Sequence, residues 1–278
     1  MPRYCLDFAY CGTHFSGYAK QIGLHTVQAQ LELGLSKVLP NRWKTDVSVV
    51  VAARTDAGVH AKHQVVHFDD ETADLDLCVT LRRLNRVLPD DITAYKLVRV
   101  PDDFSARFWA SERTYKYRIC DSPYPNPLRT VDVHNTFRKL DVTKMNKAVY
   151  GFTGVHDFAA FVKFRRGATT IRNLKYFKFK RVRYGKDRGL IVATLTADAF
   201  AYNMVRSLVG AAIFVGLEKR PINWMRQCLD AKVRCGATGA TNPSGLTLER
   251  VKYVSSPKRA RCRMKKIRAR RKNSYENT

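Results

Sequence analysis

The sequence lacks the signatures of several common classes of enzyme. Its seven cysteines form no Cys-x-x-Cys pair, so a zinc site is not expected. Neither the Gly-x-Ser-x-Gly turn of many hydrolases nor a glycine-rich nucleotide-binding loop occurs in the 278 residues. No apolar run approaches the ~20 residues that cross a bilayer. These absences predict a protein that uses neither a metal nor a cofactor and does not span a membrane.

Acidic residues are few beside basic ones. The chain has 24 Asp and Glu against 50 Lys and Arg, for a formal net charge of +26. Ten of the basic residues fall between positions 258 and 272, yet without them and Glu276 the chain still has 40 basic and 23 acidic residues. Such a surface attracts polyanions, of which RNA and DNA are the usual ones. An anionic membrane is the competing partner, but the sequence has neither a basic amphipathic helix nor an apolar anchor.

Cysteine usage bears on the compartment. The seven cysteines are scattered, odd in number and not preceded by a secretory signal, which fits a reducing environment. The first strand begins near Arg3 and leaves little room for a cleavable presequence. We therefore expect an intracellular reducing compartment, the cytoplasm or the nucleus, while a mitochondrial location stays open.

The apolar pattern predicts an α+β protein of two related halves, residues 1–105 and 106–255. In the first half, strands are expected at 3–10, 48–53, 63–68 and 92–100, and helices at 27–38 and 77–88. This β-α-β-β-α-β order is a split βαβ pattern. In the second half, strands are expected at 112–120, 175–183, 190–196 and 246–254, and helices from about 141, at 202–215 and at 223–231. The strands should form a largely antiparallel sheet flanked by helices.

Residues 256–278 lose the apolar periodicity and form a basic tail. We expect this tail to be disordered, and a nuclear address or an RNA-binding extension are the alternatives.

One carboxylate, Asp56, draws attention because it follows a predicted buried strand, in the segment 53–60 (ARTDAGVH). Loops that leave rigid strands often carry catalytic groups. By itself, however, Asp56 would more often form a turn or pair with Arg54. The Asp pairs at 69–70, 90–91 and 102–103 lie at strand ends or beside proline, which favours turns over the converging carboxylates of a two-metal nuclease.

A series of motifs resembles those of the TruA-type tRNA pseudouridine synthases, in the same order, over roughly residues 4–254. Residues 54–61 match the family segment RTDAGVHA, with Ala53 where the family usually has Gly. Tyr18, where Trp is usual, and Ser244 are the other departures. Further matches are 10–17 (YCGTHFSG), 26–32 (TVQAQLE), 104–108 (FSARF), 113–117 (RTYKY), 156–161 (HDFAAF), 170–172 (TIR), 200–206 (FAYNMVR) and 243–246 (PSGL).

The resemblance implies an isomerase that converts uridine in RNA to pseudouridine without cofactor or metal. Asp56 would be the catalytic carboxylate, and it could attack the sugar, attack the base or first remove a sugar proton. Arg206 would pair with Asp56 across an active-site cleft between the halves and keep it ionised. Tyr115 would stack on the target base and take part in proton transfer. By spacing alone, Arg206 would be a surface residue of an amphipathic helix and Tyr115 a core aromatic.

The resemblance also implies substrate-binding residues. Arg54 would enter the RNA stack when the target nucleotide flips out. Leu246 would line the base pocket, although a core role explains it equally well. Further candidates for phosphate contacts are Arg107, Lys163, Arg165 and Arg166.

The implied partner is the anticodon arm of tRNA, at about positions 38–40, bound by a homodimer mainly through shape and phosphate contacts. DNA and membranes are not expected as partners. Two alternatives stay open. The same chemistry could act on another structured RNA, such as mRNA or rRNA, or the chain could be a non-catalytic RNA-binding or ribosome-assembly protein.

Overall fold

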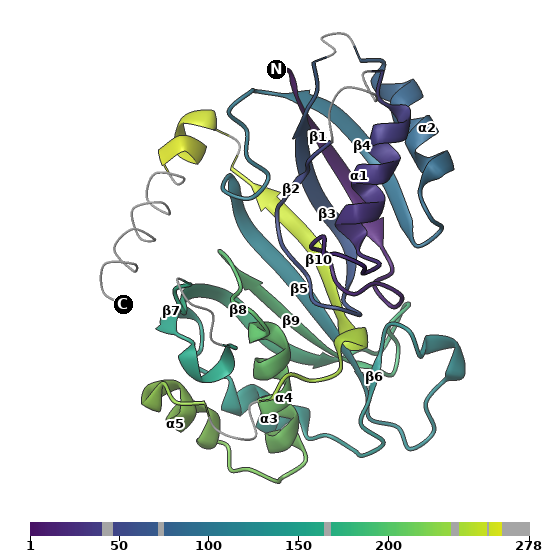
Figure 1. Cartoon of the computed structure of the whole chain (residues 1–278). Coiled ribbons are helices and arrows are strands. Elements are labelled where there is room, and N and C mark those ends of the chain that lie inside the picture. The colour runs from purple at the N-terminus through teal and green to yellow at the C-terminus, as the bar shows by residue number, and fades with distance from the viewer. Residues whose placement is uncertain (41–46, 72–74, 164–167, 235–238, 255, 263–278) are drawn as a thin grey trace. The chain divides into compact units, whose positions relative to one another are not determined.

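Strands of alternating polarity and helices with one apolar face form an α+β fold, as the sequence predicts (Figure 1). The computed structural model describes residues 1–40, 47–71, 75–163, 168–234, 239–254 and 256–262. The chain divides into two units. The first unit holds Met1–Ser111 and a closing segment that begins at Leu248, and the second holds Glu112–Thr247. None of the helices in the described ranges is long and apolar enough to cross a membrane.

The first unit has the predicted order β-α-β-β-α-β. Its elements are β1 (Arg3–Tyr10), α1 (Val27–Val38), β2 (Val50–Val51), β3 (His60–Asp69), α2 (Leu77–Val87) and β4 (Ile92–Val100). Strand β1 lies between β3 and β4 and is antiparallel to both. On the side of β3 that faces away from β1, the next strand is β10 (Leu246–Tyr253). The short β2 also pairs with β3. Helices α1 and α2 pack against each other on one face of this sheet (Figure 1), and α2 packs against β4.

Local signals account for most of these boundaries. Asp76 caps α2 by accepting a hydrogen bond from the backbone N–H of Val79 at 2.9 Å. Thr26 directly precedes α1, which begins where the sequence predicts, but the Thr26 hydroxyl makes no capping bond and is buried. The strand expected at 48–53 is shorter than predicted, because β2 covers Val50 and Val51 alone. One further backbone bond, from the N–H of Ala52 to the carbonyl of Val65 at 2.9 Å, joins the chain to β3 before it enters the loop that carries Asp56.

The second unit has a sheet in the order β5-β9-β8-β7. Its elements are β5 (Ala110–Cys120), β6 (His134–Asn135), α3 (Val142–Ala148), β7 (Gly154–Asp157), β8 (Ile171–Arg181), β9 (Ile191–Ala197), α4 (Met204–Gly216) and α5 (Trp224–Ala231). Neighbouring strands of this order are antiparallel, and the short β6 runs parallel to β5. The hairpin predicted between the strands near 175–183 and 190–196 is confirmed as β8 and β9.

The alternation of β5 determines which side chains enter the core of the second unit. Tyr115, Tyr117 and Ile119 are buried, as the predicted apolar face requires. Helix α4 is buried along almost its whole length and packs against α3. It starts at Met204, two residues later than expected, because Asn203 has a left-handed backbone with φ of 62°.

We expect His67 on β3 to make the stability of the protein depend on pH. Burial, with a smaller contribution from Arg3, lowers the pKa of His67 from 6.5 to about 4, and its Nδ1 accepts the N–H of Ala106 at 3.1 Å. The unfolded chain binds this proton more readily than the folded protein does. The contribution of neutral His67 to the free energy of unfolding is therefore fully present above pH 6.5 and is lost as the pH falls towards 4. The loss should be about 2 to 3 kcal/mol, measured by urea unfolding across this range.

The variant His67→Gln keeps an acceptor for Ala106 and removes the titration. It should flatten the pH dependence, whereas the same change at the exposed His14 should leave it as in the parent protein. An equal slope for His67→Gln and the parent would show that another group is responsible.

Candidate active site

The loop that carries Asp56 is held by hydrogen bonds to the residues just before the carboxylate. The hydroxyl of Thr55 is hydrogen-bonded to that of Tyr10 at 2.7 Å. The carbonyl of Thr55 accepts the N–H of Tyr18 at 3.1 Å. Upstream, the side chain of Gln64 donates to the carbonyl of Ala53 at 2.7 Å. The backbone that presents Asp56 is therefore fixed by groups from β1, β3 and the loop after β1.

Two glycines allow this loop to lie against the end of β1. A Cβ atom at Gly12 would come within 2.0 Å of the carbonyl oxygen of Val59. Gly17 has φ of +99°, and a Cβ there would lie 3.2 Å from the amide nitrogen of Ala57. The N–H of Gly12 also donates to Nδ1 of the buried His60 at 3.1 Å. Glycine at positions 12 and 17 therefore lets this part of the chain lie directly against the backbone on the C-terminal side of the half-buried Asp56.

The aromatic side chains beneath the loop are neutral. Burial raises the pKa of Tyr10 to about 12, although hydrogen bonds to Thr55 and Gln64 lower it in part. Burial also raises the pKa of Tyr18 well above its ordinary value. The hydroxyl of Tyr18 is buried and finds no hydrogen-bond partner among the described residues. These phenols therefore support the loop without adding negative charge near Asp56.

The departure from the family pattern at Ala53 is compatible with the loop. Ala53 is not among the residues with positive φ, so its backbone does not require glycine. Its carbonyl accepts from Gln64, a contact that glycine would make equally well.

Arg206 lies in the first turn of α4 and is held by its neighbours. Its Nε donates to the carbonyl of Thr241 at 2.7 Å, and its Nη1 donates to the side-chain oxygen of Asn203 at 3.3 Å. In return, the hydroxyl of Thr241 donates to the backbone carbonyl of Arg206 at 3.3 Å. The guanidinium is half-buried and has a defined orientation.

Tyr115 and Leu246 are both buried, with 6% and 5% of their surface exposed. The ring of Tyr115 packs edge-on against Phe200, with centroids 5.2 Å apart. Leu246 opens β10, directly after the short 3₁₀ turn η3 (Pro243–Gly245). These positions fit the core roles that their spacing suggests, and a contact with a base stays a prediction.

The candidate phosphate-binding residues that the structure describes are exposed. Arg107 lies with its guanidinium carbon 5.7 Å from the centre of the Phe108 ring. The Nζ of Lys163 lies 5.7 Å from the centre of the Tyr202 ring. Arg165 and Arg166 lie outside the described residues.

The candidate residues thus form two sets. Asp56, Arg54 and Arg107 belong to the first unit, while Tyr115, Arg206 and Leu246 belong to the second. Among the described side chains, no group of three His, Cys, Asp or Glu residues is arranged to hold a metal ion.

Sequence reasoning missed the residues that hold these sets in place. In the first unit they are Tyr10 and Gln64, and in the second they are Tyr117 and Thr241. Tyr10 and Tyr117 stand inside the matched motifs, so the motifs contained a signal for them. Gln64 and Thr241 lie outside the matched motifs, and only their contacts in the structure identify them.

Comparisons with known proteins place the chain in a family. A family model described as tRNA pseudouridine synthase matches residues 8–108 and 148–254. A protein named tRNA pseudouridine synthase A from Bifidobacterium animalis subsp. lactis is 40% identical, over 98% of this chain and 99% of that protein. Proteins of the same name from Streptomyces griseus and Mycobacterium leprae are 44% and 39% identical, over 90% of this chain in each case and 88% and 89% of those proteins. The chain belongs to the tRNA pseudouridine synthase family, a family of isomerases.

The substitution Gly12→Ala should destabilise the first unit and displace the Asp56 loop. The new methyl group would overlap the backbone of Val59, which cannot move like a flexible side chain. We expect a loss of about 3 kcal/mol in the free energy of unfolding, measured by urea titration, and a parallel loss of turnover on tRNA.

Gly23→Ala is the matched control. Gly23, unlike Gly12, has positive φ, at +71°, but nothing lies within 4 Å of the position that a Cβ would take there. Its cost should be limited to about 1 kcal/mol of backbone strain. Equal losses for the two variants would contradict the close approach at Gly12.

Proposed function

We propose that this chain converts uridine to pseudouridine in the anticodon arm of tRNA, at about positions 38–40, with Asp56 as the catalytic carboxylate. The observation that carries the proposal is the Asp56 loop. It has the sequence of the matched family segment, and hydrogen bonds and close glycine contacts hold its backbone on both sides of the carboxylate. A reaction without cofactor needs such a fixed group, because positioning must supply much of the rate enhancement.

The reaction breaks the bond between C1′ of the ribose and N1 of the base, turns the base and forms a bond from C1′ to C5. The C5 hydrogen leaves as a proton after the new bond has formed, and N1, released from the sugar, takes up a proton, so the overall reaction is an isomerisation. A carboxylate can form a covalent adduct with the sugar or the base, or remove a sugar proton, and it can later act as a base. Each route requires Asp56 to be ionised and held in one orientation.

The residues of the second unit have complementary roles in this proposal. Arg206 faces Asp56 across a cleft and keeps it ionised, as an adjacent cation does. Tyr115 stacks on the flipped base and takes part in proton transfer, while Leu246 lines the base pocket. The support for these roles is that each residue stands in a matched motif and on a helix or strand with defined packing.

The RNA is bound through its backbone and its shape. Arg54 is exposed beside Asp56 and fills the space that the flipped nucleotide leaves in the stack. Arg107 is exposed and contacts phosphate. The net charge of +26 supplies the long-range attraction. In this proposal the protein acts as a homodimer, which light scattering would test, in an intracellular reducing compartment.

Asp56→Asn should abolish turnover, with a loss of at least about 1000-fold, because an amide can neither form the adduct nor act as a base. The measurement is release of tritium from C5 of labelled uridine in tRNA. Asp90→Asn, at an exposed turn carboxylate, is the matched control and should retain full activity. Residual activity of Asp56→Asn near that of the parent would exclude Asp56 as the catalytic group.

Mapping pseudouridine in total RNA separates the alternatives. Cells that express Asp56→Asn in place of the parent protein should lose sites in the anticodon arm of tRNA. Loss of sites in mRNA or rRNA alone would redirect the proposal to another RNA. An unchanged map together with a defect in ribosome assembly would favour the non-catalytic alternative.

Deletion of the chain from Pro257 onward should weaken RNA binding and leave the chemical step intact. The deletion removes ten basic residues between positions 258 and 272 but none of the proposed catalytic groups. The start of the tail is not disordered as expected, because residues 257–262 are helical, Ala260 is buried and Arg261 pairs with Asp103. Affinity for tRNA should fall, and the slope of log affinity against log salt should become shallower by ~0.7–0.9 for each phosphate that the shortened chain no longer neutralises. Turnover at saturating tRNA should be unchanged, and its complete loss would contradict this division of roles.

A further inference from the structure

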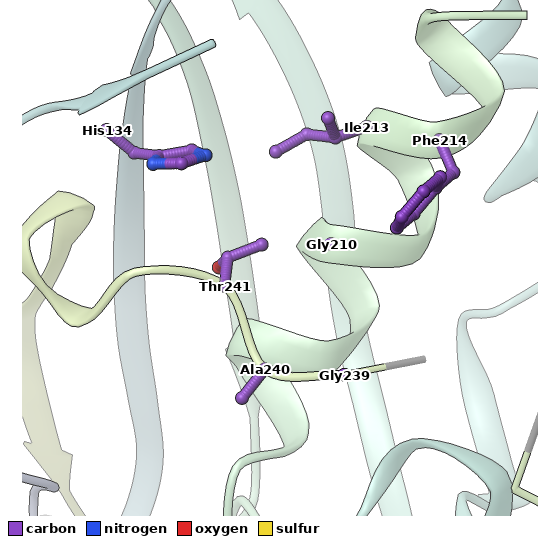
Figure 2. A pocket seen from close by; sticks show the side chains of 7 residues that line it. All are labelled: His134, Gly210, Ile213, Phe214, Gly239, Ala240 and Thr241. Carbon is purple, nitrogen blue, oxygen red and sulfur yellow. The ribbon is translucent and has the colours of Figure 1, made fainter. Parts of the chain in front are cut away.

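A short segment of the second unit connects Arg206 to the core of its sheet. Residues 239–242, called the strap here, pass alongside α4 next to Gly210 (Figure 2). The strap ends in η3, the turn that leads into Leu246. It therefore joins two of the residues that the proposed function uses.

On one side, the strap is bound to the helix face that carries Arg206. Gly210 lies four residues after Arg206 and so on the same face of α4. A Cβ at Gly210 would lie 2.9 Å from the carbonyl oxygen of Gly239 and 2.9 Å from Cγ2 of Thr241. The absence of a side chain at Gly210 lets the strap approach, and the carbonyl of Thr241 then accepts from Nε of Arg206.

On the other side, the strap is bound to β5. The hydroxyl of Tyr117 donates to the carbonyl of Asn242 at 2.6 Å, and the Tyr117 side chain is fully buried. A Cβ at Gly245 would lie 2.8 Å from the Tyr117 ring, so the turn after the strap also rests on this ring. The ring of His134 packs edge-on against Tyr117, with centroids 6.0 Å apart.

We propose that Tyr117 is a positioning residue for Arg206, acting through the strap. Its hydroxyl fixes Asn242, the adjacent Thr241 carbonyl is thereby fixed, and that carbonyl determines the direction of the Arg206 guanidinium. This inference rests on the proposed function, in which Arg206 keeps Asp56 ionised. It adds a residue that touches neither the substrate nor Asp56 in the mechanism.

The chemistry of the position favours this role over simple packing. A phenylalanine would fill the core and contact Gly245 and His134 equally well, without placing a polar hydroxyl in the interior. Burial raises the pKa of Tyr117 above its ordinary value, so the hydroxyl stays a hydrogen-bond donor throughout the working range of pH. A buried donor of this kind is costly unless its acceptor is in place.

Tyr117→Phe tests the proposal because it removes only the hydroxyl. We expect kcat on tRNA to fall roughly three- to tenfold, with KM unchanged because the RNA contacts remain. The acid limb of the pH–rate profile should move to higher pH, since a poorly oriented Arg206 stabilises ionised Asp56 less. Tyr253→Phe is the matched control, because it removes a comparable hydroxyl bond, to the carbonyl of Ala106 at 2.8 Å, in the first unit. It should change neither kcat nor the pH profile.

Two further measurements separate positioning from a general loss of structure. Exchange of the Arg206 Nε proton with water, followed by NMR of the protein without RNA, should be at least ~3-fold faster in Tyr117→Phe. In the background Arg206→Lys, which lacks the bond from Nε to Thr241, Tyr117→Phe should have no additional effect on kcat.

The outcomes decide between the proposals. Unchanged Nε exchange, or an effect of Tyr117→Phe that persists in full beside Arg206→Lys, would overturn the role of Tyr117. Faster exchange with unchanged kcat would also overturn it, because the orientation of Arg206 would then not matter for the reaction. An inactive parent protein would refute the proposed function, while the exchange measurement would still report whether Tyr117 orients Arg206. If Tyr117→Phe does not fold, Thr241→Val should give the same exchange and kcat effects, because it removes the bond from the Thr241 hydroxyl to the backbone carbonyl of Arg206, which also holds the strap against α4.

Discussion

The close approach of Gly12 to the backbone of Val59 is the contact on which the candidate catalytic loop depends. No side chain fits at Gly12, and the loop can lie against the end of β1 only because of this. The hydrogen bonds of Thr55 to Tyr10 and Tyr18 then have partners at the correct distance. The half-buried Asp56 is presented from a backbone that these contacts hold in place.

In the second unit, the side chain of Arg206 is also positioned by backbone atoms and a glycine. Arg206 is oriented by a backbone carbonyl, and a glycine at position 210 allows that carbonyl to approach. In both units the group proposed to act in chemistry is placed by backbone atoms, which are stiffer than side chains. For a reaction that uses neither cofactor nor metal in the proposed mechanism, such stiffness is a main source of catalytic power.

Much of the fold was accessible from the sequence, because its signals are local. The limits of β1 and β4 match the prediction, since alternation and the flanking turns and proline define them. The starts of α1 and α2 also match the prediction. The short strands β6 and β7 were missed, because two to four residues carry no recognisable period and exist only through pairing with β5 and β8.

The candidate site, like the fold, could be predicted from the sequence only in part. The sequence by itself determined the family, the α+β class and the choice of Asp56, because an ordered series of motifs is contained in the order of residues. It could not identify the groups that hold Asp56 and Arg206. Tyr10 and Thr55 are 45 residues apart, and Tyr117 and Asn242 are 125 residues apart. Only the tertiary structure decides such pairs, because a hydrogen bond depends on distance in space and no local pattern encodes it.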